Sequence, residues 1–221
     1  MSPLLAIIFK DVLIELRNRE TVTSMMMFGF LVVVIFNFAF DPSGAERSLI
    51  APGIIWVAFS FAGIIGLNRS LSMEIDNDCL QALLLAPLSR SDLYLAKVTS
   101  NFLFMIFSEI IVLPIFFILN NVPFTMKFLW IAGIAVLGTL GFASVGTILS
   151  TISANTRMRE VMLPVLQIPL TIPVIMASVN ATSAVLAEPR EEISAWLYLL
   201  AGFSIVYLTA SYLVFEYVVE E

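Results

Sequence analysis

The chain has 221 residues, 60% of them hydrophobic and 13% charged, with a mean hydropathy of +1.00. Soluble domains are about 45–50% apolar. The composition therefore excludes a soluble globular protein and indicates an integral membrane protein. With a formal net charge of −6, we expect no nucleic-acid partner.

The N-terminal segment, residues 1–21, is predicted to form an amphipathic helix lying along the membrane surface. Asp11 and Glu15 fall near its polar face. The opposite face is apolar and consists of Leu5, Ile8, Phe9, Val12, Leu13 and Leu16. Charged residues then predict a break before the first membrane span: Arg17, Arg19 and Glu20. The alternative is one continuous helix that extends that span.

Six apolar segments are each close to the roughly 20 residues that cross a bilayer as a helix. They are residues 22–40, 49–67, 98–119, 128–150, 161–181 and 195–215. The sequence therefore predicts an all-α polytopic membrane protein with six transmembrane helices. Eight of the eleven Lys and Arg residues fall on the side of the N-terminus. Because basic residues favour the cytoplasm, we expect both termini to be cytoplasmic.

A polar interruption, residues 68–97, separates the second and third spans. Within it, residues 73–86 have the spacing of a surface helix. One face carries Ile75, Cys79, Ala82, Leu83 and Ala86, and another carries Glu74, Asn77, Asp78 and Gln81. Pro87 is expected to end this helix. Ser89 or Ser91 is then predicted to cap a new helix, with Asp92 in its first turn, that continues into the third span.

The fourth and fifth spans have unusual compositions. Small residues recur in the fourth, including Gly138, Gly141 and Gly146, and predict close helix packing. The fifth contains three prolines, at positions 164, 169 and 173, which predict a kink and leave backbone carbonyls for neighbours to satisfy. Gln167 is a candidate for that role. A bundle that rearranges and a bundle that is only tightly packed are both consistent with these spans.

Glu109 is the acidic residue close to the middle of the third span. A buried carboxylate in lipid is costly, so its side chain should face protein or water, be protonated, or be paired. The functional interpretations are a substrate contact or a proton relay. The structural alternative is a protonated carboxyl bonded to Ser108, Asn101 or a neighbouring helix.

The chain lacks the residues that several kinds of functional site require. The chain has no histidine and a single cysteine, Cys79, which excludes an intrachain disulfide and the commonest haem and metal ligands. It also lacks the phosphate-binding loop G-x-x-x-x-G-K-[ST] and the haem-attachment motif C-x-x-C-H. We therefore expect no catalytic, cofactor or metal site in this chain, and no enzymatic activity of its own.

The arrangement of a cytoplasmic helix between spans two and three resembles the membrane subunit of ABC-2-type ABC transporters. Two stretches, residues 50–57 (IAPGIIWV) and 163–173 (LPVLQIPLTIP), are similar to the bacterial haem exporter protein B family. The stretches LQALLLAPL (80–88) and LAKV (95–98) add to the resemblance, which covers nearly the whole chain. This family is the permease subunit of the cytochrome c maturation system.

The resemblance implies a single ABC-2-type transmembrane domain, residues 1–221, in the bacterial inner membrane. It implies a homodimer that binds two copies of an ATPase subunit, beside a haem-handling membrane subunit and a small single-span subunit. ATP would be bound by the ATPase, and haem by partner subunits. ATP hydrolysis would drive haem delivery, or release of the haem-loaded periplasmic chaperone. The alternatives are an ABC-2 permease for another substrate, a secondary transporter and a structural membrane anchor.

We predict that residues 73–87 form the coupling element that inserts its apolar face into the ATPase. The residues assigned to this role are Glu74, Asp76, Asp78, Leu83, Leu84 and Pro87. Leu83 and Leu84 should contribute more than the acidic residues, because burial of a leucine is worth about 1.5–3 kcal/mol and an exposed charge about 1 kcal/mol or less. The possible functional residues inside the membrane are Glu109 and Gln167.

Overall fold

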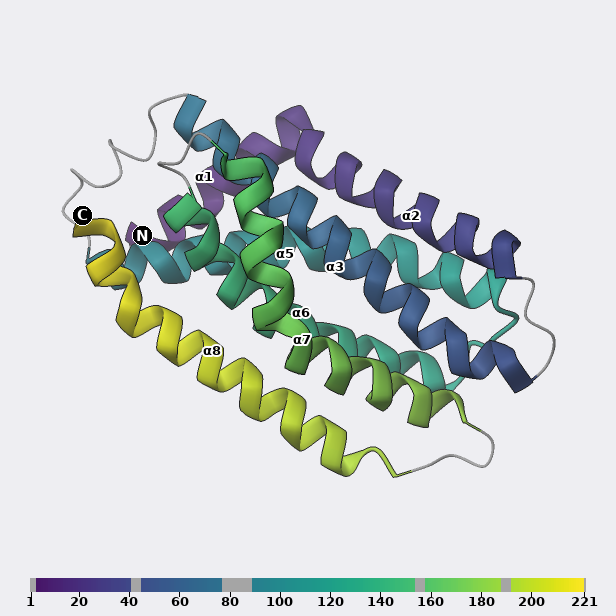
Figure 1. Cartoon of the computed structure of the whole chain (residues 1–221). Helices are drawn as coiled ribbons and strands as arrows, with labels where there is room; N and C mark the ends of the chain where they lie inside the picture. Colours follow the sequence, from purple (N-terminus) through teal and green to yellow (C-terminus); the bar gives the residue numbers. More distant parts are fainter. Residues whose placement is uncertain (1–2, 41–44, 77–88, 154–157, 188–191, 221) are drawn as a thin grey trace.

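The computed structural model describes residues 3–40, 45–76, 89–153, 158–187 and 192–220, and its regular elements in these ranges are α-helices (Figure 1). They are α1 (Pro3–Asn18), α2 (Glu20–Phe40), α3 (Ala45–Asp76), α5 (Arg90–Leu119), α6 (Met126–Ser153), α7 (Arg159–Leu186) and α8 (Ser194–Glu220). The described ranges contain no strand, so the prediction of an all-α protein is confirmed.

Six of these helices are long and apolar enough to cross a membrane. The qualifying stretches are Glu20–Ala39, Ile50–Ser70, Arg90–Leu119, Met126–Ser153, Val161–Leu186 and Ser194–Val218. Each holds at least the roughly 20 residues that cross the hydrocarbon layer. The six predicted spans are therefore confirmed, and α1 is a separate N-terminal helix.

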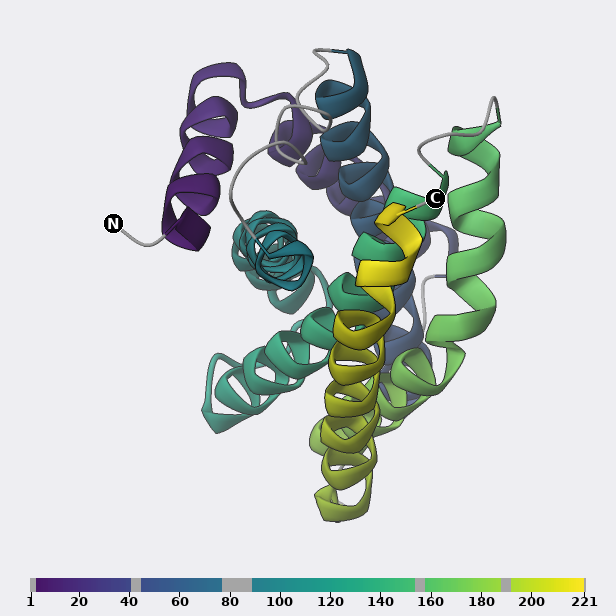
Figure 2. The ribbon, with the colours of Figure 1, turned by 90° about the vertical axis from the view of Figure 1, so that its left-hand side faces the viewer.

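The chain turns between α1 and α2 at Arg19, whose φ of 55° lies in the left-handed region. The Arg19 N–H donates to the carbonyl oxygen of Glu15 at 2.6 Å, which closes the last turn of α1. This is a helix C-cap that glycine usually provides. From here α1 packs against α5 instead of continuing the line of α2, and Figure 2 shows α1 and α7 on opposite sides of the bundle. The predicted break is confirmed.

The polar side of α1 faces the bundle. Glu15 is buried there with Ile7, and the Asp11 side chain is 10% exposed. Much of the predicted apolar face is instead exposed: Leu5, Phe9, Leu13 and Leu16. The helix therefore uses its carboxylates for contacts within the protein and leaves its apolar face outward, where a membrane-surface helix meets lipid.

The second span does not end where the hydropathy ends. We expected the span to stop at Leu67 and a new helix to begin at Met73, but α3 continues without a break to Asp76. Residues 68–76 contain neither proline nor glycine, so nothing interrupts the helical hydrogen bonds. The boundary at Met73 is therefore wrong. Residues 77–88, which hold the rest of the predicted surface helix, lie outside the described residues.

The helix α6 lies among α3, α5, α7 and α8 and contacts all four. Its small residues allow this. A Cβ added at Gly138 would lie 2.5 Å from a ring carbon of Trp56 on α3 and 2.8 Å from Ser178 Oγ on α7. A Cβ at Gly141 would lie 2.8 Å from Ser204 Oγ on α8. The predicted close packing of the fourth span is thus confirmed.

Candidate functional site

The helices α3 and α5 lead into and out of residues 77–88, so their adjoining ends are the structural frame of the predicted coupling segment. At the start of α5, Ser89 Oγ accepts a hydrogen bond from the Asp92 N–H at 3.0 Å. Of the two serines expected as caps, Ser89 is therefore the one used. We call the charged contacts that hold these helix ends to α1 and α2 the N-terminal junction: Asp11, Glu15, Glu20, Arg69 and Lys97.

An ion pair between Asp11 and Lys97 joins α1 to α5. Lys97 Nζ lies 2.9 Å from Asp11 Oδ2, and each side chain is 10% exposed. Lys10 Nζ lies 3.0 Å from the other carboxylate oxygen of Asp11. One carboxylate therefore holds two ammonium groups. Because a buried ion pair is costly to break by removing one partner, this contact fixes α1 on α5.

Glu15 joins α1 to α2. Its Oε1 accepts a hydrogen bond from the Val22 backbone N–H at 2.7 Å, in the first turn of α2. The first N–H groups of a helix have no partner within the helix, and the helix dipole favours a negative charge there. The buried Glu15 carboxylate thus satisfies one such donor from outside the helix and holds the two helices together.

A second ion pair, between Glu20 and Arg69, joins the start of α2 to the last part of α3. In the predicted membrane topology this part of α3 faces the cytoplasm. Both side chains are about half exposed, 50% and 48% respectively. Exposed pairs of this kind contribute little to stability. The N-terminal junction as a whole nevertheless connects α1 and α2 to both helices that border residues 77–88.

The predicted coupling residues lie at the edge of what the structure describes. The backbone of Glu74 and Asp76 forms the last turns of α3, but their side chains lie outside the described part. Asp78, Leu83, Leu84 and Pro87 also lie outside the described residues. Their role in coupling stays a prediction.

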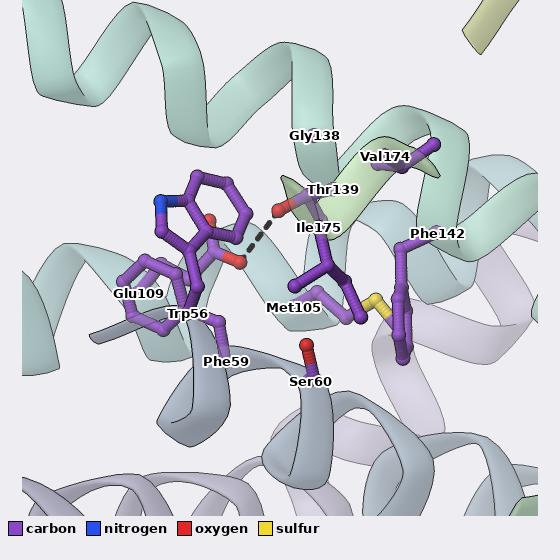
Figure 3. Close-up of a pocket in the computed structure, with 10 residues that line it drawn as sticks. All are labelled: Trp56, Phe59, Ser60, Met105, Glu109, Gly138, Thr139, Phe142, Val174 and Ile175. Atoms are coloured by element: carbon purple, nitrogen blue, oxygen red, sulfur yellow. Dashed lines mark hydrogen bonds between the residues drawn. The ribbon is translucent and has the colours of Figure 1, made fainter. Parts of the chain in front are cut away.

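Glu109 is buried between α5 and α6 (Figure 3). Thr139 Oγ1 donates a hydrogen bond to Glu109 Oε1 at 2.6 Å, whereas Oε2 has no hydrogen-bond partner in the part of the chain that the structure describes. Of the three bonding partners we considered, the neighbouring helix is the correct one. The Asn101 side-chain amide instead donates to Thr147 Oγ1 on α6, two turns from Thr139, at 3.0 Å.

A small cavity lies beside Glu109. Its volume of about 10 Å³ has room for about one water molecule. Trp56, Ser60 and Phe142 are among the side chains that line it. Its described lining includes no second acidic or basic side chain. The arrangement suits a carboxyl that packs helices together, and it offers no second group for a proton relay.

Gln167 lies apart from Glu109. It is fully buried where α7 passes Gly146 of α6, and a Cβ at Gly146 would lie 2.6 Å from Gln167 Nε2. Gly138 beside the Glu109 cavity and Gly146 are separated by two turns of α6, about 12 Å along the helix. The expectation that Gln167 bonds a backbone carbonyl freed by proline is wrong, because neither of its side-chain amide atoms has a hydrogen-bond partner among the described residues.

A different side chain bonds the backbone of the proline-rich helix. Tyr207 Oη on α8 donates to the carbonyl oxygen of Leu170 on α7 at 2.6 Å. Farther along, Trp56 Nε1 on α3 donates to Thr182 Oγ1 on α7 at 2.9 Å. Both contacts attach α7 to its neighbours. Neither was predicted, because a hydroxyl or indole that reaches another helix leaves no pattern in the local sequence.

The junction residues were also missed as a site. Lys97 was considered only as one of the basic residues and as part of the stretch LAKV, and Asp11 and Glu15 only as the polar side of an amphipathic helix. The sequence feature that could have indicated this site is the four-residue spacing of Asp11 and Glu15, which places both on one helix face. The described residues include no group of three or more Cys, Asp or Glu that could hold a metal ion.

Comparison with known proteins shows the family to which the chain belongs. The family model described as CcmB protein matches residues 2–220. Heme exporter protein B of Bradyrhizobium diazoefficiens is 28% identical over 94% of this chain and 93% of its own length. The proteins of the same name from Haemophilus influenzae and Rhodobacter capsulatus are 26% and 23% identical, over 81% and 77% of this chain and 81% and 78% of their own lengths. The chain therefore belongs to the CcmB protein family, the haem exporter protein B family.

Proposed function

We propose that this chain is the membrane subunit of an ABC transporter for cytochrome c maturation, which couples ATP hydrolysis by a partner to haem delivery or to release of a haem-loaded periplasmic chaperone. The observation that carries the proposal is the family match over residues 2–220. The relatives' name, heme exporter protein B, supports a role in haem export.

In this proposal, ATP hydrolysis is coupled to the membrane spans through the two helices that border residues 77–88. An ATPase that moves this segment acts directly on the end of α3 and the start of α5. Because α3 runs unbroken from its membrane span to Asp76, a displacement of its end tilts the span itself. The ion pairs of Lys97 with Asp11 and of Arg69 with Glu20 then carry the movement to α1 and α2.

In this proposal, partner subunits bind ATP and haem. The chain lacks a phosphate-binding loop, so ATP is bound by the ATPase subunit, in two copies on a homodimer of this chain. It also has no histidine to act as an axial haem ligand. Haem is therefore handled by the other membrane subunits and by the periplasmic chaperone. In this scheme both termini and residues 68–97 face the cytoplasm, where ATP is available.

A secondary transporter is the principal alternative from another class, since such proteins bind substrate near mid-membrane at broken helices. The three prolines of α7 are the feature in its favour. The cavity at Glu109 has room for about one water molecule and is too small for a substrate. An ABC-2 permease for another substrate and a structural membrane anchor are distinguished by whether an ATPase binds and cytochrome c matures.

The test replaces Leu83 and Leu84 with Ser, singly and together, in cells that depend on this chain for cytochrome c maturation. We expect the double variant to lose most of the co-purifying ATPase and most of the mature cytochrome c. The matched control is Leu213→Ser with Val214→Ser, two adjacent apolar residues exposed on α8. Assembly and maturation that are unchanged in the first double variant, with normal protein in the membrane, would refute the coupling assignment.

A further inference from the structure

A groove lies between α1, the start of α2 and the middle of α5, away from the Glu109 cavity. Its volume is about 570 Å³, within the roughly 300–1,000 Å³ of sites that hold small-molecule ligands. Its walls are mainly apolar and include Val12, Leu16, Val22, Met26, Leu103 and Phe107. Leu16, Leu103 and Phe107 are exposed. The groove is thus open, mainly apolar and lined by three helices, which suits a hydrocarbon chain.

Arg19 lies at the edge of this groove and is the basic residue of its lining. Its side chain is exposed, and its guanidinium makes no ion pair or hydrogen bond with a described residue. Of the nearby carboxylates, Glu20 is paired with Arg69, and Glu15, which also lines the groove, is buried and accepts a hydrogen bond from the Val22 N–H. Arg19 therefore presents an exposed positive charge, in no ion pair with a described residue, at a mainly apolar groove.

The backbone gives an independent reason to assign Arg19 a role. Its φ of 55° is a conformation that glycine or asparagine adopts at lower cost. A residue that only ended α1 would be better as glycine. Strained residues of this kind occur at ligand-binding positions. Arg19 also immediately precedes the first membrane span, Glu20–Ala39, and basic side chains next to a span are expected near the lipid headgroups.

We propose that this groove holds one acyl chain of an anionic phospholipid, with the lipid phosphate paired to Arg19. Basic sites between membrane helices bind anionic headgroups, and guanidinium is the side chain best suited to phosphate. A chain in the groove covers the apolar side chains of α2 and α5 that the fold leaves open under α1. The bound lipid fills the space between the N-terminal helix and the bundle.

The experiment uses native mass spectrometry of the full chain in detergent, titrated with phosphatidylglycerol or phosphatidylcholine of the same acyl composition. We expect tighter binding of one phosphatidylglycerol. Arg19→Asn retains a residue that tolerates the left-handed backbone but removes the charge. It should weaken phosphatidylglycerol binding about fivefold and leave phosphatidylcholine unchanged, since one basic side chain near a membrane surface is worth about 1 kcal/mol.

The matched control is Arg17→Asn, a basic residue in the last turn of α1 that does not line the groove. It should leave both affinities unchanged. Leu103→Trp fills the groove and should remove the first bound molecule of either lipid, which tests the site even if Arg19→Asn does not fold. Equal binding of the two lipids, or equal losses in the two arginine variants, would overturn the proposal. A lipid-free dimer that Leu103→Trp converts to a monomer would assign the groove to a second copy and also overturn it.

Discussion

The N-terminal junction and the middle of the bundle hold their helices together by different chemistry. The junction uses ionised side chains, Asp11 with Lys97 and Glu20 with Arg69. The middle uses neutral donors, such as the Thr139 hydroxyl on Glu109 and the Trp56 indole on Thr182, together with glycine contacts. An ionised side chain costs little free energy near the lipid headgroups, where water is close, and much more at the middle of the membrane. Ion pairs therefore hold α1 and α2 in place at the junction, whereas small residues allow α6 to pack closely in the middle of the bundle.

The largest expected effect is at the junction. Asp11→Ala removes the carboxylate that holds both Lys97 and Lys10, and leaves the mostly buried Lys97 ammonium without it. We expect the free energy of unfolding to fall by about 3 kcal/mol. Circular dichroism during unfolding in mixed detergent micelles measures it. The control is Lys10→Met, which removes a cation that is 35% exposed and should cost less than about 1 kcal/mol. Equal losses in the two variants would show that burial does not distinguish these contacts.

The next effect tests packing at mid-membrane with two glycines of the same helix. Gly138→Ala places a methyl group 2.5 Å from the Trp56 ring and should cost about 2 kcal/mol through overpacking. Gly133→Ala meets no atom within 4 Å and should stabilise by about 0.5–1 kcal/mol, because alanine is the better helix former. The same unfolding measurement applies. Destabilisation by Gly133→Ala, or none by Gly138→Ala, would contradict the assigned packing.

A smaller effect concerns the Glu109 carboxyl. Glu109→Leu removes the acceptor of the Thr139 hydroxyl and should cost about 1 kcal/mol. Glu109→Gln keeps an acceptor oxygen and should be nearly neutral in stability. Both variants should support cytochrome c maturation in cells if the residue only packs helices. Loss of maturation in Glu109→Gln, with a stable protein, would instead give the carboxyl a functional role.

The smallest effect is at the exposed end of the junction. Arg69→Gln breaks the ion pair with Glu20, but both side chains are about half exposed. We expect a loss of about 0.5 kcal/mol, which decreases as salt is added. Unfolding at two salt concentrations measures this. A salt-independent loss as large as that of Asp11→Ala would show that the two ion pairs are not different in kind.

Much of the fold follows from local sequence. Hydropathy predicts the six spans, the charges around Arg19 predict the break before α2, and Ser89 is recognisable as a cap. The end of α3 was mistaken because a change in polarity does not stop a helix that contains no proline or glycine. Local pattern locates where helices can begin, and it is weaker on where they end.

The candidate sites were less predictable because they depend on pairs of residues that are far apart in the chain. Lys97 and Asp11 are 86 positions apart, and Thr139 and Glu109 are 30 apart. Which helices adjoin is decided by packing of the whole bundle, so neither partner could be named from the sequence. Glu109 was found because its chemistry is unusual for its surroundings, whereas Glu15 and Asp11 looked like the ordinary polar side of a surface helix.

The most direct test of the account is a photo-crosslink in living cells. A benzoylphenylalanine is placed at Leu84, in the predicted coupling segment, or at Ser43, between the first two spans on the opposite side of the predicted topology. The account predicts a crosslink between position 84 and the ATPase subunit, and none from position 43. A crosslink to the ATPase from position 43, or none from position 84 in an assembled complex, would contradict both the coupling role and the orientation.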